Sequence, residues 1–315
     1  MSADATALVT TSTEVEAAST RSGRRRGPTV GSGEVFRLMP RWLVAVLTAL
    51  LCILVLVPIL YIFLASLNTD LGVASGEFFP SSLSGESYAK IWTTVGLSRA
   101  LINSLIVSGS VAIASALLGT VTAYVLVRYS FLGRVTILRG LLGLQSIPQT
   151  LMLLPVFVLF SSAGSYLGVT VIGTRWGLFI AYLTFALPFS TWVMVTYLRG
   201  LPHELEEAAR IDGASSTDIL IKIIFPLSLP AIVVSGIFAF LLGWNDVLFA
   251  SIMTRPDTHT AAVALQVFGA TQEGGAVPVY SQMMAAALVC ALPVVILYFV
   301  FQRYLVGGLT AGSVK

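Results

Sequence analysis

The chain has 315 residues, of which 56% are hydrophobic and only 10% are charged. A soluble globular protein carries about 25% charged residues. This composition therefore excludes a soluble enzyme, and it also excludes disordered, collagenous and nucleic-acid-binding proteins. The formal net charge of +3 is small, so the position of the charges along the chain is more informative than their sum.

Long stretches without charged residues mark the predicted membrane spans, because a helix needs about 20 apolar residues to cross about 30 Å of hydrocarbon. The third stretch, 140–174, is too long for one helix and too short for two, and its polar end predicts one span that ends near Ala163. Five or seven spans remain alternatives if this stretch is misread. The sequence thus predicts an all-α, polytopic membrane helix bundle with six transmembrane helices, at 42–69, 100–127, 140–163, 176–198, from 223 onward with only Asp246 as an interruption, and 283–302.

The distribution of lysine and arginine predicts the orientation of the chain. An even number of spans places both termini on the same side of the membrane. With a cytoplasmic N-terminus, the outer segments hold only Lys90, Arg99, Arg175 and Arg255. By the positive-inside rule, both termini are predicted to be cytoplasmic in a multi-pass protein of the cell membrane. The cations of the inner segments are Arg21, Arg24, Arg25, Arg26, Arg37, Arg41, Arg128, Arg134, Arg139, Arg199, Arg210, Lys222, Arg303 and Lys315.

The first 40 residues differ in composition from the rest. Residues 1–40 are rich in Ser, Thr, Ala and Gly and contain three consecutive arginines at 24–26, which predicts a disordered, basic cytoplasmic tail. The arginines are expected to fix orientation or to meet anionic lipid headgroups. A nucleic-acid partner is not expected, because no aromatic residues interleave the basic ones. Residues 41–98 are predicted to form the first transmembrane helix and an external segment.

Motifs for catalysis and for nucleotide binding are missing from the sequence. None of the lysines, at 90, 222 and 315, follows a glycine, so a P-loop is excluded. The two cysteines and two histidines show no metal-ligand spacing, and we predict neither catalytic residues nor a metal. Asp246 is the one ionisable residue within the predicted spans, where it either lines a pathway or meets interfacial water. If ATP drives this protein, the ATPase is a separate polypeptide.

The inner loop 200–226 has an unusual pattern. Acidic residues at 204, 206 and 207 suit the start of a helix, and Gly213 suits its end. Leu205, Ala208 and Ala209 share one face of that helix, and the two alanines leave it shallow enough for another protein to approach. Ser215 or Ser216 can cap a second short helix, whose apolar side is expected to lie against the membrane or the bundle. Pro226 and Pro230 are expected to bend the entry into the fifth span. The alternative is a solvated linker with favourable helix ends.

The same loop resembles the EAA loop of binding-protein-dependent ABC importers. Glu207-Ala208-Ala209 is followed after three residues by Gly213, and after nine more by the sequence at 223–226, Ile-Ile-Phe-Pro. The family usually has Leu where Phe225 stands. The segments 209–214, 244–246 and 302–312 are similar to the carbohydrate-uptake class, specifically its maltose-type second permease subunit. The resemblance covers roughly residues 40–315 and implies the type I ABC importer permease fold.

The resemblance also implies that this chain works in a complex whose subunits have different functions. Two permeases would form the pathway as a heterodimer, two ABC ATPase subunits would carry ATP and Mg, and an extracytoplasmic binding protein would deliver the solute. No cofactor is expected on this chain. It implies a permease core at 99–303 with a coupling loop at 200–226, and a cytoplasmic tail at 304–315 in which Thr310 and Gly312 contact the ATPase. The implied coupling residues are Glu207, Ala208, Ala209, Asp212, Gly213 and Pro226.

Solute contacts are open to more than one interpretation. A sugar pathway needs amide or hydroxyl partners and aromatic surfaces, but polar residues in spans also join helices to one another. The residues in question are Gln145, Gln149, Trp244, Asn245, Asp246 and Gln282. The expected solute is a sugar or oligosaccharide. The alternatives are a non-sugar solute such as a glycerol phosphate ester, a stand-alone secondary transporter, for which no repeated motif is seen, and an intramembrane enzyme.

Overall fold

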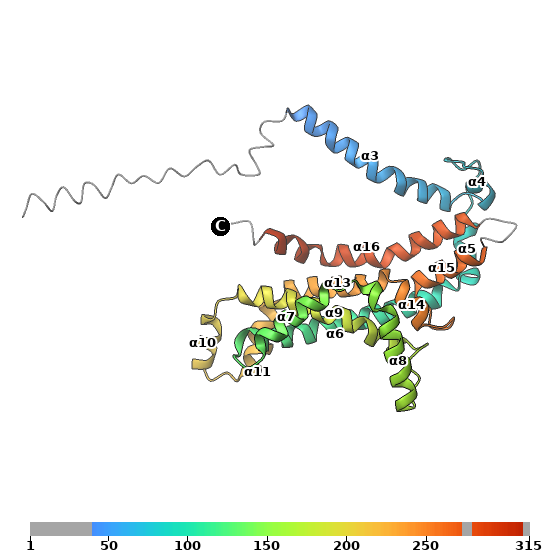
Figure 1. The fold of residues 1–315 in the computed structure, drawn as a ribbon. Helices are drawn as coiled ribbons and strands as arrows, with labels where there is room; N and C mark the ends of the chain where they lie inside the picture. The colour runs from blue at the N-terminus through green and yellow to red at the C-terminus, as the bar shows by residue number, and fades with distance from the viewer. Residues whose placement is uncertain (1–39, 273–278, 311–315) are drawn as a thin grey trace, which may run out of the picture. The chain divides into compact units, whose positions relative to one another are not determined.

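A computed structural model describes residues 40–272 and 279–310, and every regular element within these ranges is a helix. The chain divides into two units, 1–58 and 59–315. In the first unit, the described residues form most of α3 (Arg41–Ser66), which contains Pro58. The second unit begins with the end of α3 and holds all the other helices (Figure 1).

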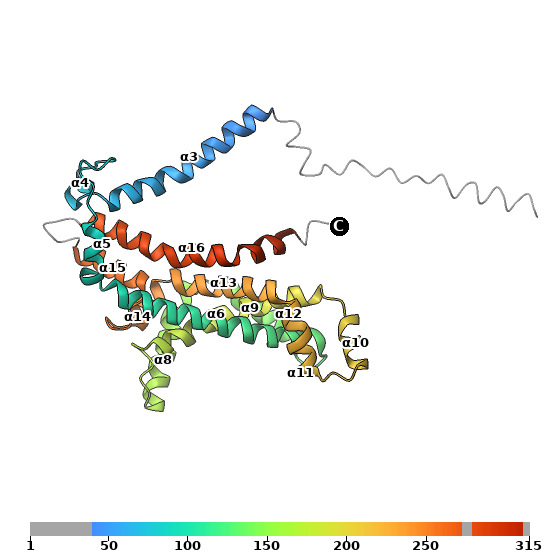
Figure 2. The same cartoon turned by 180° about the vertical axis from the view of Figure 1, so that it is seen from behind.

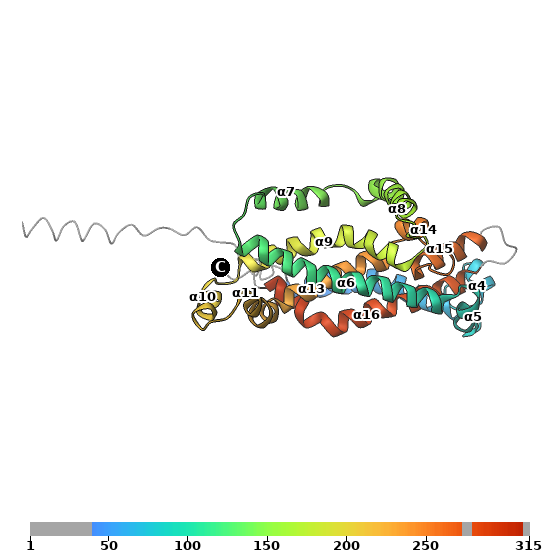
Figure 3. The ribbon, with the colours of Figure 1, turned by 90° about the horizontal axis from the view of Figure 1, so that it is seen from below.

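Three long helices form the core of the second unit. They are α6 (Leu97–Arg128), α9 (Arg175–Arg199) and α13 (Leu229–Asn245), and they pack against one another along their lengths (Figures 1 and 3). Small residues occupy the crossings, as membrane bundles require for close approach of backbones. A Cβ atom added at Gly119 of α6 would lie 3.0 Å from the Cβ of Ser190 in α9. The helices therefore meet where the sequence supplies glycine.

The remaining helices surround this core. Helix α16 (Tyr280–Thr310) packs against α13, and α7 (Arg134–Gln145) packs against α9 (Figures 1 and 3). The other elements are α4 (Asp70–Ala74), α5 (Glu86–Thr94), η1 (Gln149–Met152), α8 (Leu153–Leu167), α10 (Glu204–Ile211), α11 (Ser216–Ile219), η2 (Leu220–Ile224), α12 (Phe225–Leu227), α14 (Leu248–Met253) and α15 (Ala261–Gln272).

The predicted spans agree with the helices, and the third stretch needs a correction. Among residues 40–272 and 279–310, five helices are long and apolar enough to cross a membrane, and the count is six if the pair Ser216–Leu227 and Leu229–Asn245, which is bent by 75°, is one span. The fifth predicted span is therefore broken, because Pro226 and Pro230 interrupt the backbone hydrogen bonds on both sides of Ser228. The third stretch contains two helices, α7 and α8, separated near Pro148, and α8 ends at Leu167 rather than near Ala163.

The short helices gather at the two ends of the core. Helices α10 and α11 lie at one end, and α4, α5 and α15 lie at the other (Figures 1 and 2). The loop 200–226 is thus at the opposite end of the core from residues 67–96.

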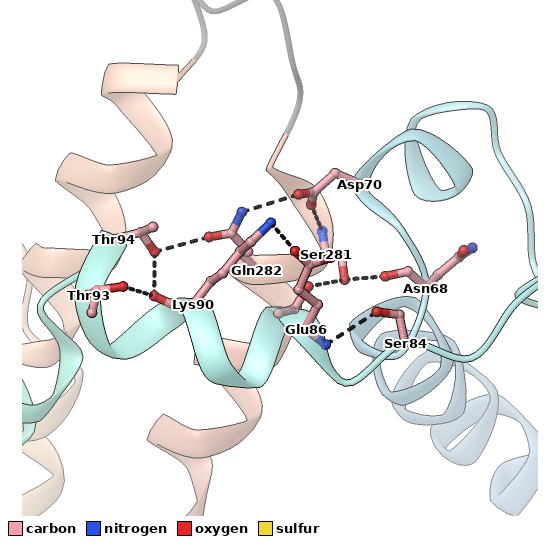
Figure 4. Close-up of polar contacts among 10 residues, drawn as sticks. Asn68, Asp70, Ser84, Glu86, Lys90, Thr93, Thr94, Ser281 and Gln282 are labelled. Atoms are coloured by element: carbon pink, nitrogen blue, oxygen red, sulfur yellow. Dashed lines mark hydrogen bonds and ion pairs between the residues drawn. The ribbon is translucent and has the colours of Figure 1, made fainter.

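A cluster of hydrogen bonds ties the start of α16 to α4 and α5 (Figure 4). The carboxylate of Asp70 accepts from the backbone N–H of Ser281 at 2.9 Å and from the side-chain amide of Gln282 at 3.2 Å. Gln282 in turn accepts from the hydroxyl of Thr94 at 3.0 Å, and the Ser281 hydroxyl donates to the carbonyl of Asn68 at 2.7 Å. The negative carboxylate stabilises the start of α16, where backbone N–H groups lack partners within the helix.

Candidate functional site

Residues 201–219 form two short helices joined by a tight turn, and we call this segment the elbow. Helix α10 ends at Ile211, and Gly213 adopts a φ of +84°, a conformation that glycine reaches without strain. The side chain of Ser215 caps α11, and Asp218 completes a capping box. The predicted glycine turn is confirmed, and Ser215 rather than Ser216 is the cap.

The outer surface of the elbow is exposed. Glu207, Ala208, Asp212 and Gly213 are all exposed, and the side chain of Ile211 is 86% exposed. An isoleucine with so little burial at the tip of a charged turn gains nothing from folding of the isolated chain. The elbow therefore has a small, partly apolar exposed surface.

The inner surface of the elbow is packed against the helix bundle. Ala209 packs against a buried cluster that contains Met194 and Leu198 of α9, and Ile219 and Ile224 belong to the same cluster. Ile219 is fully buried and Ile224 is 1% exposed. The second short helix is expected to lie against either the membrane or the bundle, and in the structure it packs against the bundle. Pro226 itself is exposed, at the bend between η2 and α13.

One ion pair joins the elbow to α6. Arg128, the last residue of α6, pairs through its Nε with Glu206, and both side chains are 3% exposed. The same guanidinium contacts Nε2 of His203 at 3.0 Å and donates to the carbonyl of Leu201 at 3.4 Å. Sequence reasoning missed this contact, because 78 residues separate the partners and no local pattern links them.

A cavity of about 440 Å³ lies where α7 and η1 face α9. Gln145 and Gln149, which flank the break at Pro148, both line it, together with aromatic and apolar side chains. The side-chain nitrogen of Gln149 is buried and has no hydrogen-bond partner among the described residues. Buried amide groups normally have partners, so this donor is available to a ligand. The other lining residues are Leu144, Ile147, Pro148, Met152, Val156, Thr184, Phe185, Pro188, Phe189 and Leu242.

The other predicted pathway residues do not line this cavity. Trp244 is 6% exposed and stacks on Phe240, with ring centroids 5.2 Å apart. Asp246 accepts hydrogen bonds from the hydroxyl of Tyr182 at 2.7 Å and from the backbone N–H of Ala250 at 2.9 Å. Asp246 thereby joins α9 to the start of α14. Asn245 is exposed at the end of α13.

The predicted C-terminal contact can be placed only in part. Thr310 is the last residue of α16, and Gly312 lies outside the described residues.

The fold and the elbow define a class of protein, a multi-pass membrane permease. The family of binding-protein-dependent transport system inner membrane components matches residues 115–310, which is more than half of the chain. The chain belongs to this family. The matched region includes the elbow and the core helices α9 and α13.

Curated relatives from several organisms resemble most of the chain. The trehalose transport system permease protein SugB of Mycobacterium tuberculosis is 32% identical over 272 residues, covering 86% of this chain and 96% of that protein. The trehalose/maltose transport system permease protein MalG of Thermococcus litoralis is 31% identical, covering 86% and 94%. The alpha-glucoside transport system permease protein AglG of Rhizobium meliloti is 35% identical, covering 75% of this chain but 61% of that protein.

A solved structure shares the fold. One chain of a bacterial ABC transporter that imports the acidic polysaccharide alginate superposes with a TM-score of 0.69 at 21% identity, covering 88% of this chain and 99% of that chain. The predicted permease fold is confirmed by this likeness, together with the family match.

Proposed function

We propose that this chain is a permease subunit of an ATP-driven importer that takes up a sugar or oligosaccharide from an extracytoplasmic binding protein. The observation that carries this proposal is the exposed elbow, which has the EAA-type spacing and lies in a chain of the transporter family. The sugar assignment is supported by the relatives, which are named for trehalose, maltose and alpha-glucoside transport.

In this proposal the elbow and both termini face the cytoplasm. The excess of arginine in the inner segments supports this orientation. The elbow lies at the opposite end of the core from α4 and α5, which supports their placement on opposite sides of the membrane. Residues 1–40 and 304–315 are then cytoplasmic tails, 41–98 supplies the first span and an external segment, and 99–303 is the permease core.

The elbow docks on a separate ATPase subunit, one of a pair that carries ATP and Mg. Glu207 meets basic or donor groups of the ATPase, Ala208 permits close approach, and Gly213 sets the angle between α10 and α11. Asp212 shapes the same surface, and Ala209, which packs against the bundle, holds α10 in place beneath it. Pro226 sets the bend into α13, and Thr310 and Gly312 contact the ATPase from the C-terminal tail. ATP binding and hydrolysis shift the bundle between two states, which requires contacts that differ between them.

The pathway is formed with a second permease subunit, and the cavity at the break between α7 and α8 contributes to it. Gln145 and Gln149 can hydrogen-bond sugar hydroxyls, and aromatic rings such as Phe185 can cover an apolar sugar face. A volume of about 440 Å³ lies within the range of small-molecule sites. Trp244, Asn245 and Asp246 act mainly in positioning the outer end of α13.

Co-purification tests the proposal. The full chain, tagged and extracted from its native membrane in mild detergent, is expected to bring down a P-loop ATPase and a second multi-span permease. Exchange of Ala208 for tryptophan is expected to release the ATPase while the second permease is retained, because Ala208 lies on the exposed docking surface. Recovery of the chain without any ATPase from native membranes would contradict the proposal.

A further inference from the structure

We propose that Arg128 and Glu206 are positioning residues that transmit movement between the elbow and helix α6. The inference rests on the proposed function and adds a mechanical connection to it. The two chain connections of the elbow lead to α9 on one side and, through η2 and α12, to α13 on the other. Helix α6 packs against both α9 and α13 but has no chain connection to the elbow, so it can follow the elbow only through side-chain contacts.

The guanidinium of Arg128 is suited to this connection. It lies at the last residue of α6 and reaches three points of the elbow, the carboxylate of Glu206, the ring of His203 and the carbonyl of Leu201. An arginine side chain is planar and has only donors. His203 must therefore accept through Nε2, which places its ring proton on Nδ1. Contacts in several directions fix α10 against α6 in both position and rotation.

Burial makes the ion pair rigid. Both side chains are 3% exposed, whereas the neighbouring Glu204 and Glu207 on the same helix are exposed. Breaking a buried pair leaves an uncompensated charge, while an exposed pair contributes little. The acidic residues of α10 are therefore of two kinds. Glu204 and Glu207 face outward, whereas Glu206 points inward and contacts α6.

The experiment uses the assembled transporter in proteoliposomes and measures two rates, solute uptake and ATP hydrolysis. The test variants are Glu206→Gln, which keeps the size of the side chain but removes its charge, and Arg128→Lys, which keeps the charge but loses the planar set of donors. The matched control is Glu204→Gln, which removes the same charge from the same helix. A double variant, Arg128→Glu with Glu206→Arg, restores the pair with its charges exchanged.

The expected result is a several-fold fall in solute molecules transported per ATP in both test variants, at a normal amount of assembled complex. The control is expected to keep the wild-type ratio, and the exchanged pair is expected to recover part of the loss. Three results would overturn the proposal: a wild-type ratio in the test variants, an equal fall in Glu204→Gln, or loss of the assembled complex in both conservative variants, which would show that the pair serves folding alone. Failure of the proposed function is distinguishable, because the wild-type complex would then show no ATP-dependent uptake.

Discussion

Gly213 shows how one residue sets the shape of the elbow. Its φ of +84° lies in the left-handed region, and a Cβ atom added there would have nothing within 4 Å. A substitution at this position therefore meets no steric clash, and its cost comes from the backbone, about 1–2 kcal/mol for an ordinary residue. The angle between α10 and α11 changes if the chain relieves this strain.

We expect Gly213→Val to lower solute uptake per ATP several-fold while the chain still inserts and assembles, because a β-branched residue disfavours positive φ most strongly. Gly213→Asn is the matched variant, since asparagine tolerates this conformation, and it is expected to stay near wild type. Uptake and ATP hydrolysis in proteoliposomes measure both. Normal coupling in Gly213→Val would remove the elbow angle from the mechanism.

Replacement of Gln149 distinguishes a role in solute binding from a role in stabilising the fold. Its side-chain nitrogen is buried in the cavity wall without a partner among the described residues, so replacement by leucine removes no hydrogen bond of the folded chain. We expect Gln149→Leu to leave thermal stability unchanged or slightly raised. The KM for the solute is expected to rise about 10-fold, the equivalent of one hydrogen bond of about 1.4 kcal/mol.

Uptake measured against solute concentration tests this prediction. The control is Thr150→Val, an exposed neighbour in the same short helix that does not line the cavity. An unchanged KM in Gln149→Leu would mean that this cavity lies outside the solute pathway.

At the scale of elements, α6 and α9 approach each other closely because Gly119 of α6 has no side chain. A Cβ atom at Gly119 would lie 3.0 Å from the Cβ of Ser190 and 3.1 Å from the backbone nitrogen of Thr191. Neither neighbour can move without moving α9. At Gly109, ten residues earlier in the same helix, an added Cβ would have nothing within 4 Å.

We therefore expect Gly119→Ala to lower the apparent melting temperature of the purified complex, since overpacking costs about 1–3 kcal/mol. Gly109→Ala is expected to raise it slightly or leave it unchanged, because alanine favours helix by about 1 kcal/mol over glycine. Thermal unfolding in detergent compares the two variants. Equal melting temperatures would show that α6 and α9 separate readily at this crossing.

The start of α16 gives a second prediction at this scale. Asp70→Ala removes the acceptor of both the Ser281 amide and the Gln282 side chain, so the first turn of α16 is expected to exchange its amide hydrogens faster. The control is Glu86→Ala, which removes another carboxylate of the same cluster. Its partner, the side chain of Lys90, is 48% exposed, so this variant is expected to have little effect on the exchange of the α16 amides. Hydrogen exchange followed by mass spectrometry resolves this segment, and equal protection in the two variants would contradict the capping role of Asp70.

Sequence and structure agree best where the determinants are local. The turn at Gly213 and the cap of α11 each depend on a few neighbouring residues, and charge-free stretches locate most of the spans. The break near Pro148 was missed because proline alone does not show whether a helix bends or ends. The contacts of Arg128 with Glu206 and of Asp246 with Tyr182 were missed because they join residues 78 and 64 positions apart, and such pairings depend on how the helices pack.

At the scale of the whole molecule, the three core helices connect two distant parts of the second unit. Helices α6, α9 and α13 run from the elbow toward the end where α4, α5 and α15 lie (Figures 1 and 2). The cavity with Gln145 and Gln149 lies against α9 between these ends. Helix α9 contacts both the elbow and the cavity, so in the proposed mechanism a displacement of the elbow would reach the cavity through α9.

The central claim is that the energy for transport comes from a separate ATPase polypeptide. Reconstitution tests this claim most directly. Proteoliposomes containing this chain, its partner permease and the ATPase subunits are supplied with labelled solute and the binding protein. We expect uptake only when ATP is enclosed on the side of the elbow and the binding protein is present on the other side. Solute uptake by vesicles that contain this chain alone, without ATP, would contradict the account.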